Sequence, residues 1–362
     1  MLASVDFDPT IEDEVIETNA EDAESTGIKK SIFDSLRDEI LNSDLDEAEK
    51  KRRLSALSKA GSRHVNIMLI SATGAGKSST VNALFDMSVA KVGIGVDPET
   101  KEITKFDLNN LTIWDTPGLG DGVEEDKAYI KQIVRKLSEK GNDGKLLIDL
   151  VLVVLDASSK DLSMSYDLIT KTLIPCLGKE NAHRILIAVN QSDMAMKGRH
   201  WDYELNAPDE VLQDFLTRKA ESVKRRIKEA TGVTVEPVCY CAGYTDDDGN
   251  QQPPYNLSKL LYYILTAVPA EKRLVLAGNL NEDKRNWTSN DKDNNYTEAV
   301  TETVTKGFFE SFMDGFSAGL ERGAVIGGCA FGLPGAVVGG LVGGIYGGLS
   351  ALVVKPLLKL AG

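Results

Sequence analysis

A glycine-rich turn between a predicted strand and a predicted helix is the feature that most constrains this chain. Residues 64–70 are mostly apolar and predict a buried strand. Residues 71–78 follow with Ser-Ala-Thr-Gly-Ala-Gly-Lys-Ser, and a helical pattern comes next. Glycines let consecutive backbone N–H groups point to one centre, and a helix N-terminus adds positive potential. The stretch therefore predicts a phosphate-binding loop.

The side chains of this loop indicate a nucleotide site. Lys77 can reach the β- and γ-phosphates, and Ser78 can ligate Mg²⁺. The other expected nucleotide contacts lie in the same loop and the first helical turn: Thr73, Gly74, Ala75, Gly76 and Ser79. Ser71 departs from the G-x-x-x-x-G-K-[ST] pattern, because it stands where the first glycine is usual. The alternative is a strand-to-helix turn that is glycine-rich without binding anything.

A second predicted strand ends in an aspartate. Residues 111–119 read Leu-Thr-Ile-Trp-Asp-Thr-Pro-Gly-Leu, an apolar strand followed by a tight turn. Asp115 would hold Mg²⁺ through water, and the N–H of Gly118 would meet the γ-phosphate. An ordinary strand-end turn is the alternative. The position of Asp115, 38 residues after Lys77 (115 minus 77), favours the magnesium site.

A third segment selects the base. The predicted strand that ends at Asn190 continues as Asn-Gln-Ser-Asp. A carboxylate at Asp193 can accept hydrogen bonds from both the guanine N1–H and the exocyclic amine, a pair that adenine lacks. Asn190 would hold the loop and the ring edge, whereas Gln191 stands where a lysine is usual. Cys241 and Ala242 fit the last guanine-contacting loop, where a small residue and a backbone N–H meet the base oxygen.

This ordered set of motifs resembles the translation-factor-related P-loop GTPases. It looks closest to the Era-like and bacterial ribosome-GTPase-like branch, with some likeness to the immune-associated and chloroplast import-receptor GTPases. The resemblance implies an α/β fold, in which helices flank a mostly parallel, doubly wound sheet, and GTP or GDP bound with Mg²⁺. It also implies a switch threonine that ligates Mg²⁺. Thr100 is the candidate for this residue, and Thr104 is the second choice.

Two departures from the family bear on catalysis. Leu119 follows Gly118 at the position where the Ras-type branch has a glutamine that orients water, and a leucine cannot orient water. Gly74 stands where a potassium-dependent group of enzymes carries an asparagine. We therefore expect slow GTP hydrolysis that dimerisation or a partner protein stimulates, with Lys77 and Thr100 as the catalytic candidates.

The remainder of the chain divides by composition. Nine acidic residues and no lysine or arginine precede residue 27, so residues 1–27 predict a disordered acidic tail. Apolar positions at helical spacing predict a helical extension over residues 28–62. The GTPase domain would then span residues 63–270, and the polar residues 271–305 predict a linker.

The last segment, residues 306–362, has glycines that recur every four positions. Residues 323–354 contain 32 consecutive residues without Asp, Glu, Lys or Arg. On a helix, such glycine rows form grooves where helices approach closely, and a membrane span needs roughly 20 apolar residues. We expect a glycine zipper that associates with a membrane, as one kinked span or as a hairpin that turns at Pro334. A soluble packed hairpin and a flexible tail are the alternatives.

Composition also bounds location and partners. The first residues are acidic rather than basic and then apolar, so we expect a cytoplasmic, membrane-associated protein. A net charge of −14 and a pI near 4.9 argue against nucleic acid as a partner. The basic residues between Lys219 and Lys228 lie on one predicted helix and are expected to be solvated.

Three functions follow from these features. The first is a GTP-binding switch that its C-terminus tethers to a membrane, with a homodimer or a larger oligomer as its possible assembly. The second is an effector whose nucleotide state gates membrane insertion, with hydrolysis secondary. The third is a soluble GTPase that binds a protein or the ribosome and uses its tail for packing.

Overall fold

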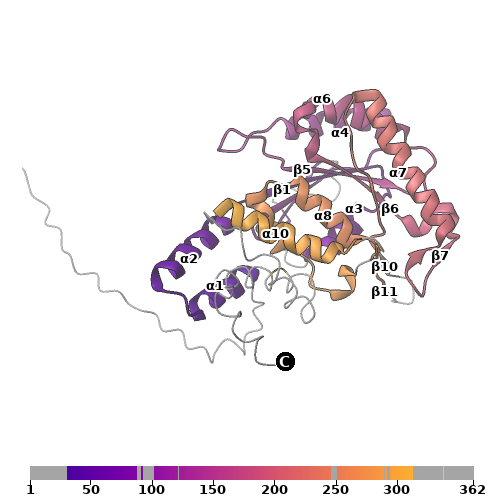
Figure 1. Ribbon diagram of the computed structural model, residues 1–362. Coiled ribbons are helices and arrows are strands. Elements are labelled where there is room, and N and C mark those ends of the chain that lie inside the picture. The colour runs from indigo at the N-terminus through magenta and orange to yellow at the C-terminus, as the bar shows by residue number, and fades with distance from the viewer. Residues whose placement is uncertain are drawn as a thin grey trace, which may run out of the picture. The chain divides into compact units, whose positions relative to one another are not determined.

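The computed structural model describes residues 31–87, 91–92, 102–120, 122–245, 251–288, 290–291, 294–312 and 337. Within them a seven-stranded sheet has the order β2-β3-β4-β1-β5-β6-β9. The central strand, β1 (Val65–Ser71), pairs in parallel with β4 (Leu111–Asp115) and β5 (Leu150–Asp156). The strand that leads into the glycine-rich turn therefore lies between the strand that ends at Asp115 and β5. Figure 1 shows β1 beside β5.

The other strands extend the sheet on both sides. β5 pairs in parallel with β6 (Ile185–Asn190), and β6 pairs in parallel with β9 (Val238–Cys239). β3 (Thr104–Asp107) runs antiparallel to β4 and to β2 (Lys91–Val92). Two small hairpins stand apart from this sheet, β7 (Trp201–Asp202) with β8 (Ala207–Pro208) and β10 (Tyr244–Thr245) with β11 (Gln251–Gln252). The arrangement is a P-loop GTPase fold, which confirms the predicted fold class.

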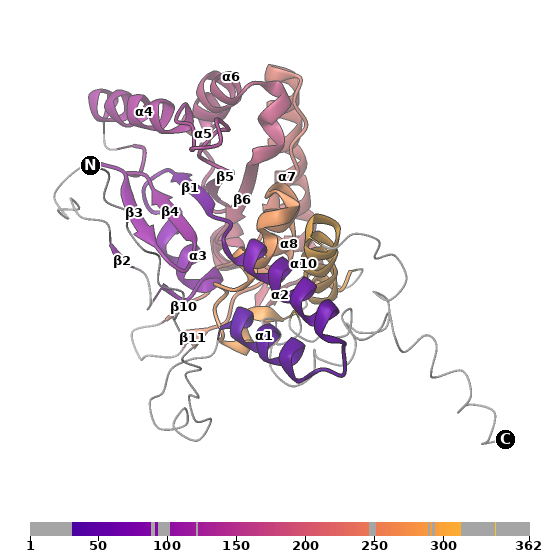
Figure 2. The same ribbon diagram turned by 90° about the vertical axis from the view of Figure 1, so that its left-hand side faces the viewer.

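Helices cover both faces of the sheet, which is why its central strands are mostly apolar on both faces. Met68 and Ile70 of β1 face one layer, whereas Ile67 and Leu69 face the other. The first layer contains α4 (Val123–Leu137), α5 (Ser163–Leu168), the π-helix η2 (Ile169–Leu173), α6 (Ile174–Leu177) and α7 (Glu210–Thr231). The second contains α1 (Ile32–Asn42), α2 (Glu47–Gly61), α3 (Lys77–Leu84), α8 (Leu257–Ala267), α9 (Arg273–Ala277) and α10 (Tyr296–Phe312). Both views show the two layers on opposite sides of the sheet (Figure 2).

The linker expected at residues 271–305 is wrong. The described part of this range forms η5 (Ala270–Lys272), α9, η6 (Lys284–Trp287) and the first part of α10. Leu274 and Trp287 are buried in the core. The asparagines that made the segment look solvated bind backbone carbonyls instead: Asn279 Nδ2 donates to Val275 O at 2.8 Å, and Asn286 Nδ2 donates to Ala83 O at 3.0 Å.

The boundary expected at residue 306 is also wrong, because α10 continues through it to Phe312. Phe308 and Phe309 lie beyond that boundary and are buried. The helical extension expected over residues 28–62 contains α1 and α2.

The predicted acidic tail of residues 1–27 lies outside the described residues, as do residues 313–336 and 338–362 of the predicted glycine zipper. Val337 is described, and its side chain is buried in the second helix layer. Among the described residues, none of the helices is both long and apolar enough to span a membrane.

Candidate functional site: a phosphate loop beside two carboxylates

The phosphate loop connects β1 to α3. Gly74 and Gly76 have φ angles of 80° and 89°, in the left-handed region that favours glycine. A Cβ at Gly76 would also overlap the side chain of Asn190, so two independent constraints select glycine there. Lys77 begins α3, and its Nζ donates to Ser71 Oγ at 3.1 Å. The serine that departs from the usual loop pattern is therefore a hydrogen-bond partner of the lysine.

The turn after β4 lies against this loop. Leu119 N donates to Ser71 O at 3.0 Å, and Thr73 N donates to Leu119 O at 2.9 Å. Gly118 packs so closely that a Cβ would lie 2.5 Å from Thr73 Oγ1 and 2.9 Å from Thr73 Cα. The Leu119 side chain is 2% exposed and points into the core, so it contributes its backbone to the site and cannot contact a substrate water.

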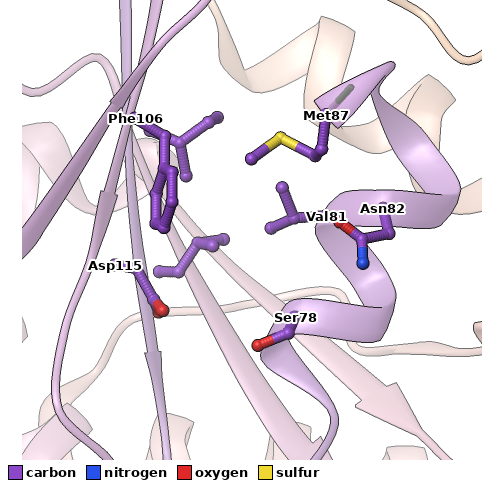
Figure 3. Close-up of a pocket in the computed structure, with 8 residues that line it drawn as sticks. Ser78, Val81, Asn82, Met87, Phe106 and Asp115 are labelled. Carbon is purple, nitrogen blue, oxygen red and sulfur yellow. The ribbon is translucent and has the colours of Figure 1, made fainter. Parts of the chain in front are cut away.

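Ser78 and Asp115 face each other at one end of a cavity of about 220 Å³ (Figure 3). The rest of its lining is mostly apolar, including Val81 and Phe106. Burial raises the pKa of the Asp115 carboxyl, while the nearby Lys77 ammonium lowers it. The Oδ1 atom of Asp115 is buried, and no described residue provides it with a hydrogen-bond partner.

The donor set fits Mg²⁺, which prefers oxygen ligands and usually takes one or two from the protein and the rest from water and phosphate. Ser78 and Asp115 provide a hydroxyl and a carboxylate. Among the described residues, no group of three or more His, Cys, Asp and Glu side chains could hold a metal ion without such outside ligands. The orphaned Oδ1 of Asp115 is the atom that a hydrated cation would satisfy.

Residues of β3 and α4 enclose the space in front of the phosphate loop. A cavity of about 360 Å³ is lined by Lys77, Thr104, Glu102 and Tyr129, among others. Thr104, the second choice for the switch threonine, thus lies at the site, whereas Thr100 is outside the described residues. Glu102 and Tyr129 were not predicted from the sequence, because neither is part of a local motif and Tyr129 occupies the buried face of an ordinary amphipathic helix.

Asn190 and Gln191 fasten the base-side loop to the phosphate loop. Asn190 Nδ2 donates to Ala75 O at 3.0 Å, and Asn190 Oδ1 accepts from Ala242 N at 3.0 Å. Gln191 Nε2 donates to Gly74 O at 2.9 Å. One side chain therefore joins both loops, and the glutamine that replaces the usual lysine supports the phosphate loop.

Asp193 is 3% exposed, and its Oδ1 lacks a hydrogen-bond partner among the described residues. Cys241 lies beside it and pairs with Tyr255 through two backbone hydrogen bonds of 3.0 and 2.9 Å. Burial and the adjacent Asp193 carboxylate raise the pKa of the Cys241 thiol, which therefore stays protonated at neutral pH. Asp193 thus carries a buried oxygen without a partner in the loop where the guanine edge was predicted, beside the Cys241 thiol.

Of the remaining predicted residues, Ser79 is exposed on the first turn of α3. The described structure thus brings together every predicted site residue except Thr100. Their sources are the carboxyl ends of β1, β4 and β6, the loop after β9 and the start of α3.

Residues 65–229 match the AIG1 family. A curated relative from Arabidopsis thaliana, immune-associated nucleotide-binding protein 7, is 26% identical over 193 residues, which cover 51% of this chain and 56% of the relative. The uncharacterized protein YkfA of Escherichia coli K12 is 27% identical over 156 residues, 42% of this chain and 50% of YkfA. The chain thus spans about half the length of the curated relatives it matches.

Among solved structures, Toc33 from Arabidopsis thaliana in complex with GDP and Mg²⁺ is 14% identical, with a TM-score of 0.38, and the match covers 67% of this chain and 98% of Toc33. Of the groups named from the motifs, the immune-associated one is the one that the family match supports. The placement in the Era-like branch stays a prediction.

Proposed function

We propose that this protein is a guanine-nucleotide switch that binds GTP and GDP with Mg²⁺. The observation that carries the proposal is a pair of buried carboxylate oxygens, Asp115 Oδ1 and Asp193 Oδ1, which lack partners within the described structure. Leaving a buried acceptor unsatisfied costs about 1–3 kcal/mol, and more for a charged group. A hydrated Mg²⁺ at Asp115 and the guanine edge at Asp193 would satisfy both. The match to the AIG1 family and a relative named for nucleotide binding support the same assignment.

The roles of the residues follow from their positions. Lys77 and the N-terminus of α3 bind the phosphates, and Gly118 allows the turn after β4 to approach the γ-phosphate. Bound Mg²⁺ supplies positive charge to the phosphate oxygens. Asn190 holds the phosphate loop and the base loop at a constant separation. Asp193 selects guanine.

We infer that hydrolysis is slow in the isolated protein. Leu119 is buried, so the attacking water needs another polar group to orient it. Thr104, Glu102 and Tyr129 line the front of the phosphate loop and are the described candidates, beside a group from a partner or a second copy.

We further propose that the glycine-rich part of residues 306–362 associates with a membrane, because 32 of its residues in succession lack charge. The burial of Val337 within the second helix layer favours a second candidate, in which this segment packs against the GTPase domain of a soluble switch. Flotation with liposomes separates the two: the membrane proposal predicts co-flotation of the full chain in at least one nucleotide state, and failure to float in all of them favours the packed tail.

Nucleotide titration tests the proposed switch. Fluorescent GDP should bind in the presence of Mg²⁺, and fluorescent ADP should not. The Lys77→Ala variant should lose binding while it keeps the thermal midpoint of the nucleotide-free protein. Equal binding of ADP, or binding that survives Lys77→Ala unchanged, would refute the assignment.

A further inference from the structure

A basic cavity lies beside α7, and the proposed GTP chemistry makes no use of it. Its volume is about 760 Å³, within the roughly 300–1,000 Å³ of small-molecule sites. Six lysine and arginine side chains line it: Lys160, Lys197, Arg199, Arg218, Lys219 and Arg226. Among the described lining residues there is neither aspartate nor glutamate. The chain as a whole has a net charge of −14, so this gathering of cations runs against the average composition.

Four segments build the cavity, one of which, α5, contributes Tyr166. The other three are the loop at 158–162 after β5, the 3₁₀ segment η4 (Ser192–Gly198) with the two residues after it, and α7. β5 and β6 are parallel neighbours, and η4 follows the carboxyl end of β6. Crevices outside the carboxyl ends of parallel strands are where open α/β sheets bind ligands. The cavity therefore occupies a position that suits a ligand site.

The cations of the cavity differ in how far neighbouring residues already neutralise them. Arg218 pairs with Asp214 at 2.8 Å, and Lys219 Nζ donates to the carbonyl oxygens of two loop residues at 2.6 and 2.7 Å. Lys160, Lys197 and Arg199 form no ion pair with any other described residue. Three cations around one concave surface raise its positive potential, and a bound anion would lower it.

The backbone of η4 is held in an uncommon conformation at the same place. Met196 and Lys197 have φ angles of 53° and 65°, Gly198 has 70° and His200 has 68°. Residues other than glycine rarely adopt this left-handed region, and two in succession, Met196 and Lys197, are rarer still. Strained backbone of this kind collects at ligand sites, because it places side chains where regular structure would not. Here it places Lys197 at the cavity.

We propose that this cavity is a second anion site, which binds a phosphate-rich molecule of small-molecule size. Guanidinium and ammonium groups together with hydroxyl donors are the chemistry that recognises phosphate oxygens. Ser222 supplies a hydroxyl, and Phe215 and Leu162 form an apolar part of the wall. The ligand is a soluble phosphorylated compound or a phosphorylated lipid headgroup, which share this chemistry.

The basic residues of α7 expected to be solvated thus include two, Lys219 and Arg226, that line this cavity. The guanidinium of Arg226 lies 5.2 Å from the centre of the Tyr166 ring, which holds it against the wall. Ser159 and Leu162 also line a separate cavity of about 280 Å³, which Thr73 and Ala75 of the phosphate loop border, so the 158–162 loop lies between the basic cavity and the phosphate loop. The proposal does not depend on the identity of the nucleotide.

Titration calorimetry with inorganic tripolyphosphate on the full chain at low salt tests the proposal. Tripolyphosphate can also enter the phosphate loop, so two variants separate the sites. The double variant Lys197→Gln with Arg199→Gln should weaken tripolyphosphate binding at the basic cavity roughly tenfold or more. Lys77→Ala should leave tripolyphosphate binding at the basic cavity unchanged. Lys127→Gln with Lys306→Gln removes two exposed, ion-paired lysines outside the cavity and should change affinity less than about twofold. Thermal melts check that each variant folds.

A second experiment, with lipid vesicles, distinguishes a lipid headgroup from a soluble phosphorylated ligand. Vesicles of phosphatidylcholine with phosphatidylinositol bisphosphate should bind the chain only if the ligand is a lipid headgroup, and the cavity variant should then abolish that binding. Tripolyphosphate binding alone assigns a soluble ligand. The proposal is overturned if tripolyphosphate binding disappears in Lys77→Ala alone, if the control pair weakens it as much as the cavity pair, or if neither probe binds.

Discussion

Two carboxylates, each with a buried oxygen, define the chemistry of the nucleotide site at the level of single residues. Asp115 and Asp193 each carry an oxygen that is removed from water and unsatisfied within the described structure. Such groups lower the stability of the empty protein, since desolvation is not compensated by a hydrogen bond. They raise the affinity for a ligand that supplies the missing partners. The empty protein is therefore less stable, and the affinity for the nucleotide is higher, at both the Mg²⁺ end and the base end of the site.

Replacing Asp115 with asparagine should show how much stability the Asp115 carboxylate costs the nucleotide-free protein. Its carboxyl pKa is raised in the fold, so the residue contributes stability below its unfolded pKa, and that stability is lost as pH rises through the folded pKa. At pH 7 the nucleotide-free Asp115→Asn variant should therefore be more stable than the parent by on the order of 1 kcal/mol, and at pH 4 the gain should shrink. Urea unfolding at both pH values measures this. The same variant should lose the Mg²⁺ dependence of nucleotide binding; unchanged Mg²⁺ dependence would argue against a metal at Asp115.

Alanine substitutions of Leu119 and Lys77 should have opposite effects: the first should lower stability, and the second should abolish phosphate binding. Leu119 is 2% exposed in the core, so Leu119→Ala should destabilise the protein by about 2–5 kcal/mol. Its effect on hydrolysis by the remaining folded protein should be small, since its side chain points away from the site. Lys77→Ala should keep stability within about 0.5 kcal/mol and abolish phosphate binding. Chemical denaturation with single-turnover hydrolysis on each variant distinguishes them; a catalytic loss in folded Leu119→Ala as large as in Lys77→Ala would contradict this assignment.

The identity of most site residues could be predicted from sequence, because their positions are local. The glycines beside Lys77 are required by backbone angles, and Asp115 and Asn190 each end a strand that the apolar pattern marks. Tyr129 could not be predicted, since only tertiary packing of α4 brings it to the phosphate loop. The role of Gln191 was also hidden, because its hydrogen bond to a loop carbonyl depends on how β6 and β1 are placed.

At the scale of secondary-structure elements, the strands and the first helices followed from periodicity, whereas α9 and α10 did not. The reason is that the polar residues between the two helices look like a linker in the sequence, although Asn279 and Asn286 among them are buried. Asn279 Nδ2 donates to Asn109 O at 2.9 Å and to Val275 O at 2.8 Å, so it joins α9 to the turn before β4. A polar side chain that satisfies backbone carbonyls is indistinguishable in sequence from one that faces water. Composition therefore predicted a linker where the fold has a core.

The end of α10 gives a prediction at this scale. A chain that stops at residue 305 loses the buried Phe308 and Phe309, each of which would contribute about 3–5 kcal/mol by analogy with large-to-small core changes. A chain that stops at Phe312 keeps both. We expect the shorter truncation to unfold or aggregate, and the longer one to melt cooperatively and bind guanine nucleotide. Thermal melts and nucleotide titration of the pair measure this; equal stability of the two would show that α10 does not support the core.

On the scale of the whole molecule, the sheet is a platform whose carboxyl edge holds two neighbouring anion sites. The phosphate loop lies over β1, and the proposed basic cavity lies between the segments that follow β5 and β6. The 158–162 loop lines the basic cavity and a second cavity that borders the phosphate loop, so we expect occupancy of one site to affect the other. Tripolyphosphate should therefore change the GDP dissociation rate of the parent chain and leave that of Lys197→Gln with Arg199→Gln unaffected; stopped-flow release of fluorescent GDP measures this.

The central claim is that Asp193 makes the site specific for guanine, and base exchange by calorimetry tests it most directly. The parent chain should bind GTP and give no heat with ATP. Asp193→Asn inverts the donor and acceptor pattern, so GTP should weaken roughly a hundredfold and xanthosine triphosphate should gain affinity. Asp167→Asn, at an exposed ion pair, serves as the control and should match the parent. Comparable affinity of the parent for ATP, or unchanged GTP binding by Asp193→Asn, would contradict the assignment of this protein as a guanine-nucleotide switch.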